Sequence, residues 1–358
     1  MKNAIITLLG LFLSVGVFAQ STDYIQMEGN IGDNAATMSL FRVKYPYEST
    51  TVYSAYYYYH STGIPMELTQ SESKGIQLKM TYAVTNQEEE TFDGTLSNGV
   101  YKGNWTKSGA TLPFEFNAIR PHTKITHLKA NRIAPIKTTK TKEKIQGTYD
   151  FEWFVPEDRF FQKRLVENFE PKFQSFEDHS RKLILGFERE YIREINDILK
   201  MMNPEEIMPG IMSYQHFDSL FPIINNPDYF VFRHLTYAYT GGAHGISSED
   251  YYTYSFGLKK WLQKEDVFDM AQQAQIVRVI RNTIRAKYNI PDNMALDEPE
   301  NSIFITAEPD FPDNFTLSKE SVEFYYRLYE LTPYAYGFFR ISVPYSDLQA
   351  YMNPEFKY

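Results

Sequence analysis

Residues 229–258 read YFVFRHLTYAYTGGAHGISSEDYYTYSFGL. The two flanks, residues 229–240 and 249–258, are rich in tyrosine, phenylalanine and threonine, which favour β-strands. The glycines between them mark a turn, because glycine adopts backbone angles that other residues avoid. We therefore predict two strands that pair through a hairpin-like connection, GGAHGISS.

The segments before this hairpin carry a strand pattern and then a helix pattern. Residues 147–156 form a strand-like run, and helix signals dominate residues 157–202. One apolar face of that helical region follows a three-and-four spacing through Ile184, Phe187, Tyr191, Ile195 and Ile198.

The segments after the hairpin mix both kinds of element. Residues 264–290 predict a helix with Val277, Ile280 and Ile284 on one side. The remaining expected elements are strands at 302–308, 314–331 and 337–345 and a short helix at 346–351. Because helices and strands are mixed without regular βαβ alternation, we expect an α+β domain over residues 145–358.

Residues 20–118 predict a different, all-β module. Short strand patterns recur between turn signals, and Ile76, Leu78 and Met80 alternate with polar residues. The pair Asn98-Gly99 is a strong hairpin signal. The spacing indicates an antiparallel meander, either a small barrel or a curled sheet. Such a barrel would carry a small ligand only if its interior held an open apolar cavity.

The segment between these two regions, residues 119–144, is basic. It contains eight Lys or Arg residues and one Glu, and its second half has no clear periodicity. We interpret the segment as an inter-domain linker. Electrostatic attachment to an anionic surface, such as a membrane or a wall polymer, is the alternative.

The first 19 residues have the pattern of a secretory signal peptide. Lys2 precedes an apolar stretch, and Val17 and Ala19 occupy the −3 and −1 positions of a small-residue cleavage site. The mature chain would then begin near Gln20, and the alternative is an uncleaved membrane anchor. No other stretch approaches about 20 apolar residues, so we expect no transmembrane span after cleavage. The predicted location is periplasmic or extracellular.

Composition excludes several classes of function. The chain has 358 residues and no cysteine, which rules out disulfides, thiol catalysis and cysteine-bound metals. The net charge of −9 argues against a general nucleic-acid binder. No phosphate-binding loop, dinucleotide fingerprint or G-x-S-x-G motif occurs, so we assign no catalytic residue, metal or cofactor.

Three segments together resemble a known type of exported bacterial domain. They are YAYTGGAHG at residues 237–245, EDVF at 265–268, and the aromatic stretch 333–345. Over residues 145–355 the chain is similar to the extracytoplasmic domain shared by lysozyme-sensing anti-sigma factors and peptidoglycan deacetylases of the polysaccharide deacetylase C type. The resemblance implies a role at the cell wall. The sequence lacks their internal transmembrane helix, sigma-binding segment and deacetylase metal motif, so neither signalling nor deacetylation carries over.

His244 is the first candidate for chemistry in the turn. A histidine can act as an acid, a base or a ligand if a partner is near, and the nearby polar residues are His234, Glu249 and Asp250. None of these has a metal-ligand spacing relative to another. We favour a structural role in which His244 bonds a neighbouring backbone carbonyl. Asp266 is expected to cap the helix that begins near it.

Taken together, the sequence predicts an exported, non-enzymatic binding protein of the cell envelope that recognises a wall glycan or a lysozyme-like protein. The expected ligand-binding residues are Tyr239, Gly241, Gly242, His244, Tyr334 and Tyr336. One alternative is a hydrolase that uses His244 with a nearby carboxylate, which would require a separation of about 3 Å. The other is a small-ligand carrier built from the N-terminal β module.

Overall fold

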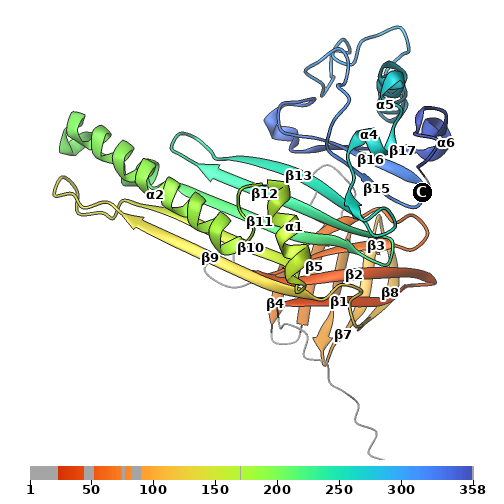
Figure 1. Ribbon diagram of the computed structural model, residues 1–358, viewed down its shortest axis with the longest axis horizontal. Helices are drawn as coiled ribbons and strands as arrows, with labels where there is room; N and C mark the ends of the chain where they lie inside the picture. The colour runs from red at the N-terminus through yellow and green to blue at the C-terminus, as the bar shows by residue number, and fades with distance from the viewer. Residues whose placement is uncertain (1–22, 44–51, 75–76, 83–89, 170, 357–358) are drawn as a thin grey trace, which may run out of the picture.

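A computed structural model describes residues 23–43, 52–74, 77–82, 90–169 and 171–356. The expected signal peptide, residues 1–19, lies outside the described residues. Three bodies pack together in Figure 1: a closed β-barrel, a long six-stranded sheet with helices along one face, and a smaller C-terminal unit. The predicted fold class, an antiparallel β module followed by mixed helices and sheet, is confirmed.

The barrel is an up-and-down meander in which each strand pairs with the next and β1 closes on β8. The Asn98-Gly99 turn has φ values of 52° and 75°, as a type I′ hairpin requires. The eight strands are β1 Tyr24–Ile31, β2 Asn34–Val43, β3 Val52–Tyr59, β4 Met66–Lys74, β5 Gln77–Tyr82, β6 Thr91–Ser97, β7 Val100–Lys107 and β8 Ala110–Ala118.

Side chains fill the interior of the barrel. Large aromatic residues meet there, and the hydroxyl of Tyr101 donates to the carbonyls of Leu78 and Phe92 at 2.9 Å each. A small-ligand carrier would need an open cavity in this interior, so the barrel does not support the carrier alternative. The buried interior residues are Met27, Ile31, Ala36, Met38, Leu40, Ala55, Tyr57, Leu68, Leu78, Met80, Phe92, Tyr101, Trp105, Phe114 and Phe116.

The six-stranded sheet has the order β14-β13-β12-β11-β10-β9. Only β10 and β11 pair in parallel within it, because the helices of residues 159–212 lie between these two strands in the chain. Its strands are β9 Ile125–Pro135, β10 Gln146–Pro156, β11 Gln215–Asn225, β12 Tyr229–Tyr239, β13 Ile246–Ser255 and β14 Lys260–Trp261. The predicted pairing of the strands around the glycine turn is confirmed as β12 and β13.

Strand β9 lies inside the basic segment for which we expected a linker. Residues 125–135 pair with β10 along their whole length, so the linker interpretation is wrong for this part. The physical reason is that β9 is an edge strand, where exposed basic side chains are well tolerated and discourage pairing with other chains. Arg132 on β9 forms an ion pair with Glu188. The boundaries between domains stay a prediction.

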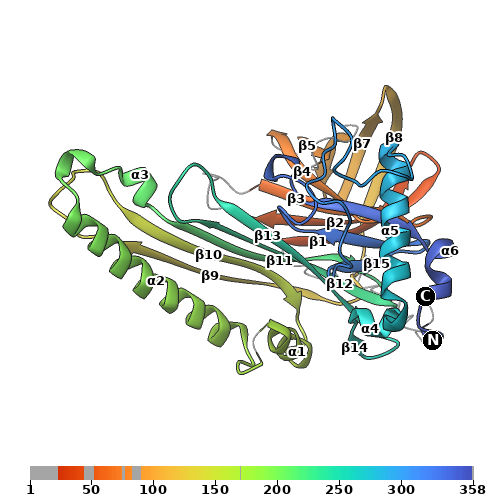
Figure 2. The same cartoon turned by 90° about the horizontal axis from the view of Figure 1, so that it is seen from above.

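Helices cover one face of the sheet, as Figure 2 shows for α2, which runs alongside β9 and β10. The predicted apolar face is confirmed in α2 (Phe176–Met201), where Phe187, Tyr191 and Ile195 are buried. Helix α1 (Arg159–Phe169) and the short α3 (Pro209–Met212) complete this layer. Within the part of the chain that the structure describes, no helix combines the length and the apolarity that a membrane span needs.

The barrel packs against the other face of the sheet. Phe41, on the outer side of β2, lies 4.9 Å from Phe154 and 5.1 Å from Phe221 between ring centroids. The tyrosine run of β3 divides between the two layers, since Tyr57 faces the barrel interior and Tyr56 belongs to the core shared with the sheet. Strands β2 and β3 are therefore buried on both sides.

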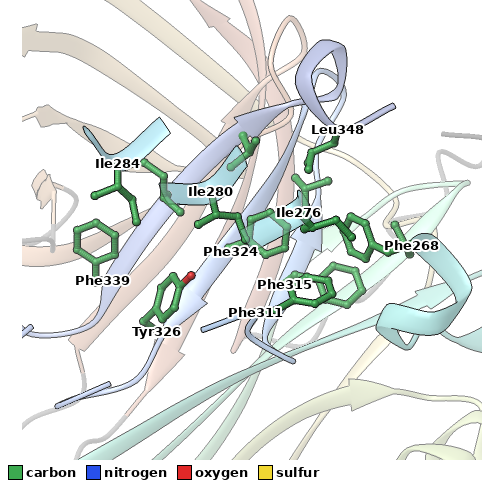
Figure 3. Close-up of a cluster of buried hydrophobic side chains, with 14 of the residues drawn as sticks. Phe268, Ile276, Ile280, Ile284, Phe311, Phe315, Phe324, Tyr326, Phe339 and Leu348 are labelled. Carbon is green, nitrogen blue, oxygen red and sulfur yellow. The ribbon is translucent and has the colours of Figure 1, made fainter. Parts of the chain in front are cut away.

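The C-terminal unit has its own core between helix α5 and a three-stranded sheet (Figure 3). Ile276, Ile280 and Ile284 of α5 are fully buried there. The elements are α4 Lys264–Val267, α5 Gln273–Tyr288, β15 Phe315–Leu317, β16 Ser321–Tyr326, β17 Phe339–Pro344 and α6 Tyr345–Leu348.

Two predictions for this unit are wrong in detail. The single helix expected over residues 264–290 is broken, because Asp269 accepts a hydrogen bond from the backbone N–H of Ala271 and starts a new helical segment. The strand expected at 302–308 is irregular. Its backbone makes separate bonds to two different segments, such as Ile305 N–H to the Leu331 carbonyl, instead of a continuous ladder.

A buried ionic junction joins all three bodies. Arg233 of β12 donates to the Tyr56 hydroxyl at 2.6 Å and to Glu67 at 3.0 Å, both in the barrel. The same guanidinium pairs with Glu249 of β13. The Tyr251 ring then stacks on Tyr325 of the C-terminal unit, with centroids 3.7 Å apart.

Candidate functional site

The β12–β13 turn has the backbone geometry that its glycines predicted. Gly241 and Gly242 have φ values of 93° and 92°, which side chains with a Cβ rarely adopt. The hydroxyl of Tyr239 donates to the Gly242 carbonyl at 3.0 Å and closes the turn. A Cβ on Gly245 would lie 2.5 Å from the Tyr237 ring, so this glycine allows close packing.

His244 is exposed and bonds backbone. Its Nδ1 donates to the Gly245 carbonyl at 2.8 Å, and its ring stacks on Tyr334 with centroids 4.3 Å apart. The Tyr334 hydroxyl donates to the same carbonyl at 3.1 Å. The partners of His244 are therefore a backbone carbonyl and a tyrosine ring. They do not include the carboxylate that the hydrolase alternative requires.

Further aromatic side chains extend this surface. Tyr329 lies 5.8 Å from Tyr334 between ring centroids and is 52% exposed. Tyr336, which ends the short 3-10 helix Tyr334–Tyr336, is 42% exposed. The C-terminal unit thus brings Tyr334, with Tyr329 beside it, to the turn, and Tyr336 follows two residues after Tyr334 in the chain.

Apolar side chains occupy the other side of the turn. A groove of about 340 Å³ runs between the end of α2, the segment around α3, and Gly241. Met208 and Ile211 line it and are 60% and 43% exposed. A Cβ on Gly241 would lie 3.3 Å from Cγ2 of Ile211, so the turn and the groove are in contact. We call the combined surface the tip patch; it consists of Met208, Ile211, His244, Tyr329, Tyr334 and Tyr336.

The structure brings together most of the predicted site residues. Tyr239, Gly241 and Gly242 shape the turn, and His244 stacks on Tyr334, which is 90 residues later in the sequence. Tyr336 is exposed two residues beyond Tyr334. The sequence reasoning missed Met208 and Ile211, because the prolines and glycine around them signalled only a break between elements.

A histidine–aspartate pair, with the aspartate buried and the histidine half-buried, lies further along the same hairpin. His234 Nε2 is 3.0 Å from Asp218 Oδ1, and the Trp153 indole donates to that same oxygen at 2.6 Å. Burial alone lowers the pKa of His234, but the Asp218 carboxylate outweighs it and raises the pKa above its ordinary value. Phe169 of α1 packs on the imidazole, so the pair is enclosed by side chains.

Two other expectations concern metals and helix capping. In the described ranges no three His, Asp or Glu side chains are arranged to hold a metal ion. Asp266 does act at the start of a helix, since it accepts from the backbone N–H of Gln263 at 2.9 Å. Asp266 therefore lies in the first turn of the helix, and the N-cap residue is Gln263.

Comparison with known protein families gives one match, in the C-terminal unit. Residues 265–346 match the model of the family described as protein of unknown function (DUF3298). This range holds Tyr329, Tyr334 and Tyr336 of the tip patch, whereas the glycine turn precedes it. No curated protein matches the chain.

Two solved structures of DUF3298 proteins are similar to the chain. One is from Bacteroides fragilis, with a TM-score of 0.53 and 18% identity over 65% of this chain and 96% of the other. The second is from Pseudomonas aeruginosa, with a TM-score of 0.45 and 15% identity over 65% of this chain and 95% of the other. At these identities the first likeness concerns the fold alone. Residues 265–346 are therefore the part of this chain that is similar to the DUF3298 family, whose function is unknown.

Proposed function

We propose that the protein is an exported, non-enzymatic binding protein of the cell envelope, and that the tip patch is its binding surface. The observation that carries this proposal is the gathering of exposed aromatic and apolar side chains around one hairpin end. Exposed groups of this kind, and tyrosine and methionine in particular, are enriched where proteins meet partners.

A muramidase-type protein is the partner we favour. The resemblance of the chain to the extracytoplasmic domain of lysozyme-sensing anti-sigma factors supports this choice. The net charge of −9 would also assist association with a basic protein. The predicted signal peptide would bring the chain to the compartment where such a partner acts.

A wall glycan is the second candidate for the same surface. The rings of His244, Tyr334 and Tyr329 form a continuous series, with successive centroids 4.3 and 5.8 Å apart. Amphipathic rings of this kind suit the apolar faces of sugar rings as well as protein side chains.

The hydrolase alternative finds less support in the geometry. The His244 ring bonds a backbone carbonyl and stacks on Tyr334. The other acid–imidazole pair, Asp218 and His234, is covered by Phe169 of α1. A binding role needs neither group to reach a substrate.

A retention experiment tests the proposal. The mature full-length protein is expected to be retained by immobilised lysozyme, and the variant Y334A/I211S to bind at least ten-fold more weakly, which corresponds to about 1.4 kcal/mol. The control is L185A, because Leu185 on α2 is an apolar side chain outside the tip patch that is 53% exposed, against 43% for Ile211.

The outcomes separate the candidates. Retention by purified peptidoglycan and not by lysozyme would replace the protein partner with the glycan. No retention of the folded protein by either material, or equal losses for Y334A/I211S and L185A, would overturn the proposal. Cell fractionation with mass measurement of the mature N-terminus tests the expected export and the start near Gln20.

A further inference from the structure

A second hollow lies on the helix-side face of the six-stranded sheet, beside α2. It has a volume of about 330 Å³, at the lower end of the range for small-molecule sites. We call it the sheet groove; the residues used in the argument are Tyr149, His216, Thr236, Ala238, Ser248 and Arg327.

The strand register explains why the face is hollow at this place. Tyr149 pairs with His216, His216 with Ala238, and Thr236 with Ser248, so these side chains point to the same face of the sheet. Thr236, Ala238 and Ser248 are small and form a low floor. The Tyr149 and His216 rings stack with centroids 5.3 Å apart and stand as a wall on the side of α2.

Polar groups in the groove are left without partners. Among the residues that the structure describes, the Tyr149 hydroxyl, the His216 ring nitrogens and the hydroxyls of Thr236 and Ser248 make no hydrogen bond. All four side chains are half-buried. Their polar atoms are open to the hollow, and a set of available donors and acceptors that lines one hollow offers a place for a bound molecule.

The charges around the groove point to a neutral ligand. Burial lowers the pKa of His216, so its imidazole is neutral near pH 7 and offers one donor and one acceptor. Burial, with a smaller effect of the Asp218 charge, raises the pKa of Tyr149, whose hydroxyl stays protonated. Arg327 at the rim pairs with Asp250 and with Glu330, so its charge is already compensated.

We propose that the sheet groove binds a neutral sugar ring. Hydroxyl groups that both donate and accept match the unpartnered hydroxyls and imidazole of the groove, and the aromatic wall offers apolar contact to the carbon face of the ring. This site is separate from the tip patch, and it does not depend on the protein partner proposed for that patch.

Calorimetric titration of the mature full-length protein tests the inference. The probes are a tetramer of N-acetylglucosamine, a tetramer of glucose, and an uncharged tetra-alanine peptide blocked at both ends. At least one sugar is expected to bind, and T236V, which replaces a hydroxyl by a methyl group of similar size, is expected to weaken binding at least three-fold. A238F, which raises the floor of the groove, is expected to weaken it at least ten-fold.

The tip-patch variant Y334A/I211S distinguishes the two proposals. It is expected to keep sugar binding within two-fold of the unchanged protein even where it loses lysozyme. Binding of the peptide but neither sugar, absence of binding by all three probes at millimolar concentration, or unchanged sugar affinity in both T236V and A238F would overturn the groove assignment. Thr236 is half-buried and valine has nearly the same shape, so T236V is expected to fold and keeps the test valid if A238F does not.

Discussion

At the scale of single residues, His234 links stability to pH. Its pKa is raised in the folded protein by Asp218, so folding favours the charged imidazole. A raised pKa contributes stability that is fully present below the ordinary value of about 6.5. This contribution is lost as the pH rises through the folded pKa.

We therefore expect H234Q to destabilise the protein more at pH 5.5 than at pH 9. The difference should be about 1.4 kcal/mol for each unit by which the pKa is raised. Denaturant unfolding at both pH values measures it. The control H122Q changes an exposed histidine and should cost little at either pH. An H234Q cost that is equal at both pH values, or larger at pH 9, would contradict the assignment.

At single residues, the sequence predicted the structure where backbone conformation alone determines which residue fits. Gly241 and Gly242 were expected in a conformation that only glycine adopts easily, and their φ values agree. It could not find the contact between His244 and Tyr334, because no local pattern connects two loops so far apart in the chain. Nor could it show that Thr236 and Ser248 share the floor of a groove, which depends on strand register.

At the scale of elements, the contact between α2 and β10 depends on one glycine. A Cβ on Gly147 would lie 2.8 Å from ring atoms of both Phe187 and Tyr191, which are buried between the helix and the sheet. Neither ring can move away without opening the helix–sheet contact. Gly186, in contrast, lies within α2, and no atom is within 4 Å of the position its Cβ would take.

The two glycines give opposite predictions for the same substitution. G147A is expected to lower the free energy of unfolding by about 1–3 kcal/mol, since overpacking strains the core. G186A is expected to raise it by roughly 0.5–1 kcal/mol, since alanine favours the helix. Denaturant unfolding of both variants checks this. The same sign of change in both would show that the packing of α2 has been misread.

Periodicity predicted the elements well where packing is one-sided. The apolar face of α2 follows from burial on one side, and the structure confirms it. In the barrel, Leu78 and Met80 are buried as the alternation predicted, and Ile76 lies outside the described residues. Strand β9 escaped prediction because an edge strand with many basic side chains looks like a linker. The expected strand at 302–308 had the right composition but no neighbouring strand with which to pair.

At the scale of the whole molecule, Arg233 holds the barrel and the long sheet together. Its side chain and that of Glu249 are 8% and 7% exposed, and burial, against the attraction of Arg233, raises the pKa of Glu67. Removing the guanidinium leaves two carboxylates without their cation in a poorly solvated place. Such losses are far larger than those at surface ion pairs.

R233A is therefore expected to lower the free energy of unfolding by about 3–5 kcal/mol. The control R181A breaks the surface ion pair of Arg181 and Asp178, whose side chains are 67% and 45% exposed. It should lower the free energy of unfolding by less than about 1 kcal/mol. Thermal and denaturant unfolding measure both. Similar small costs for the two variants would mean that the junction does not couple the bodies.

The double burial of β2 and β3 has a consequence for the order of events during synthesis. The barrel strands are consecutive and pair with their neighbours, so the barrel can close once residue 118 has left the ribosome. Its outer face around Phe41 then has no cover until β10, which carries Phe154, has been made, and no full cover until β11, which carries Phe221 and ends at Asn225, has followed. The nascent chain thus passes through a stage in which this apolar outer face of the barrel is exposed to solvent. An intermediate with this apolar face uncovered is prone to aggregate, so this interval is the one in which a chaperone has most to protect.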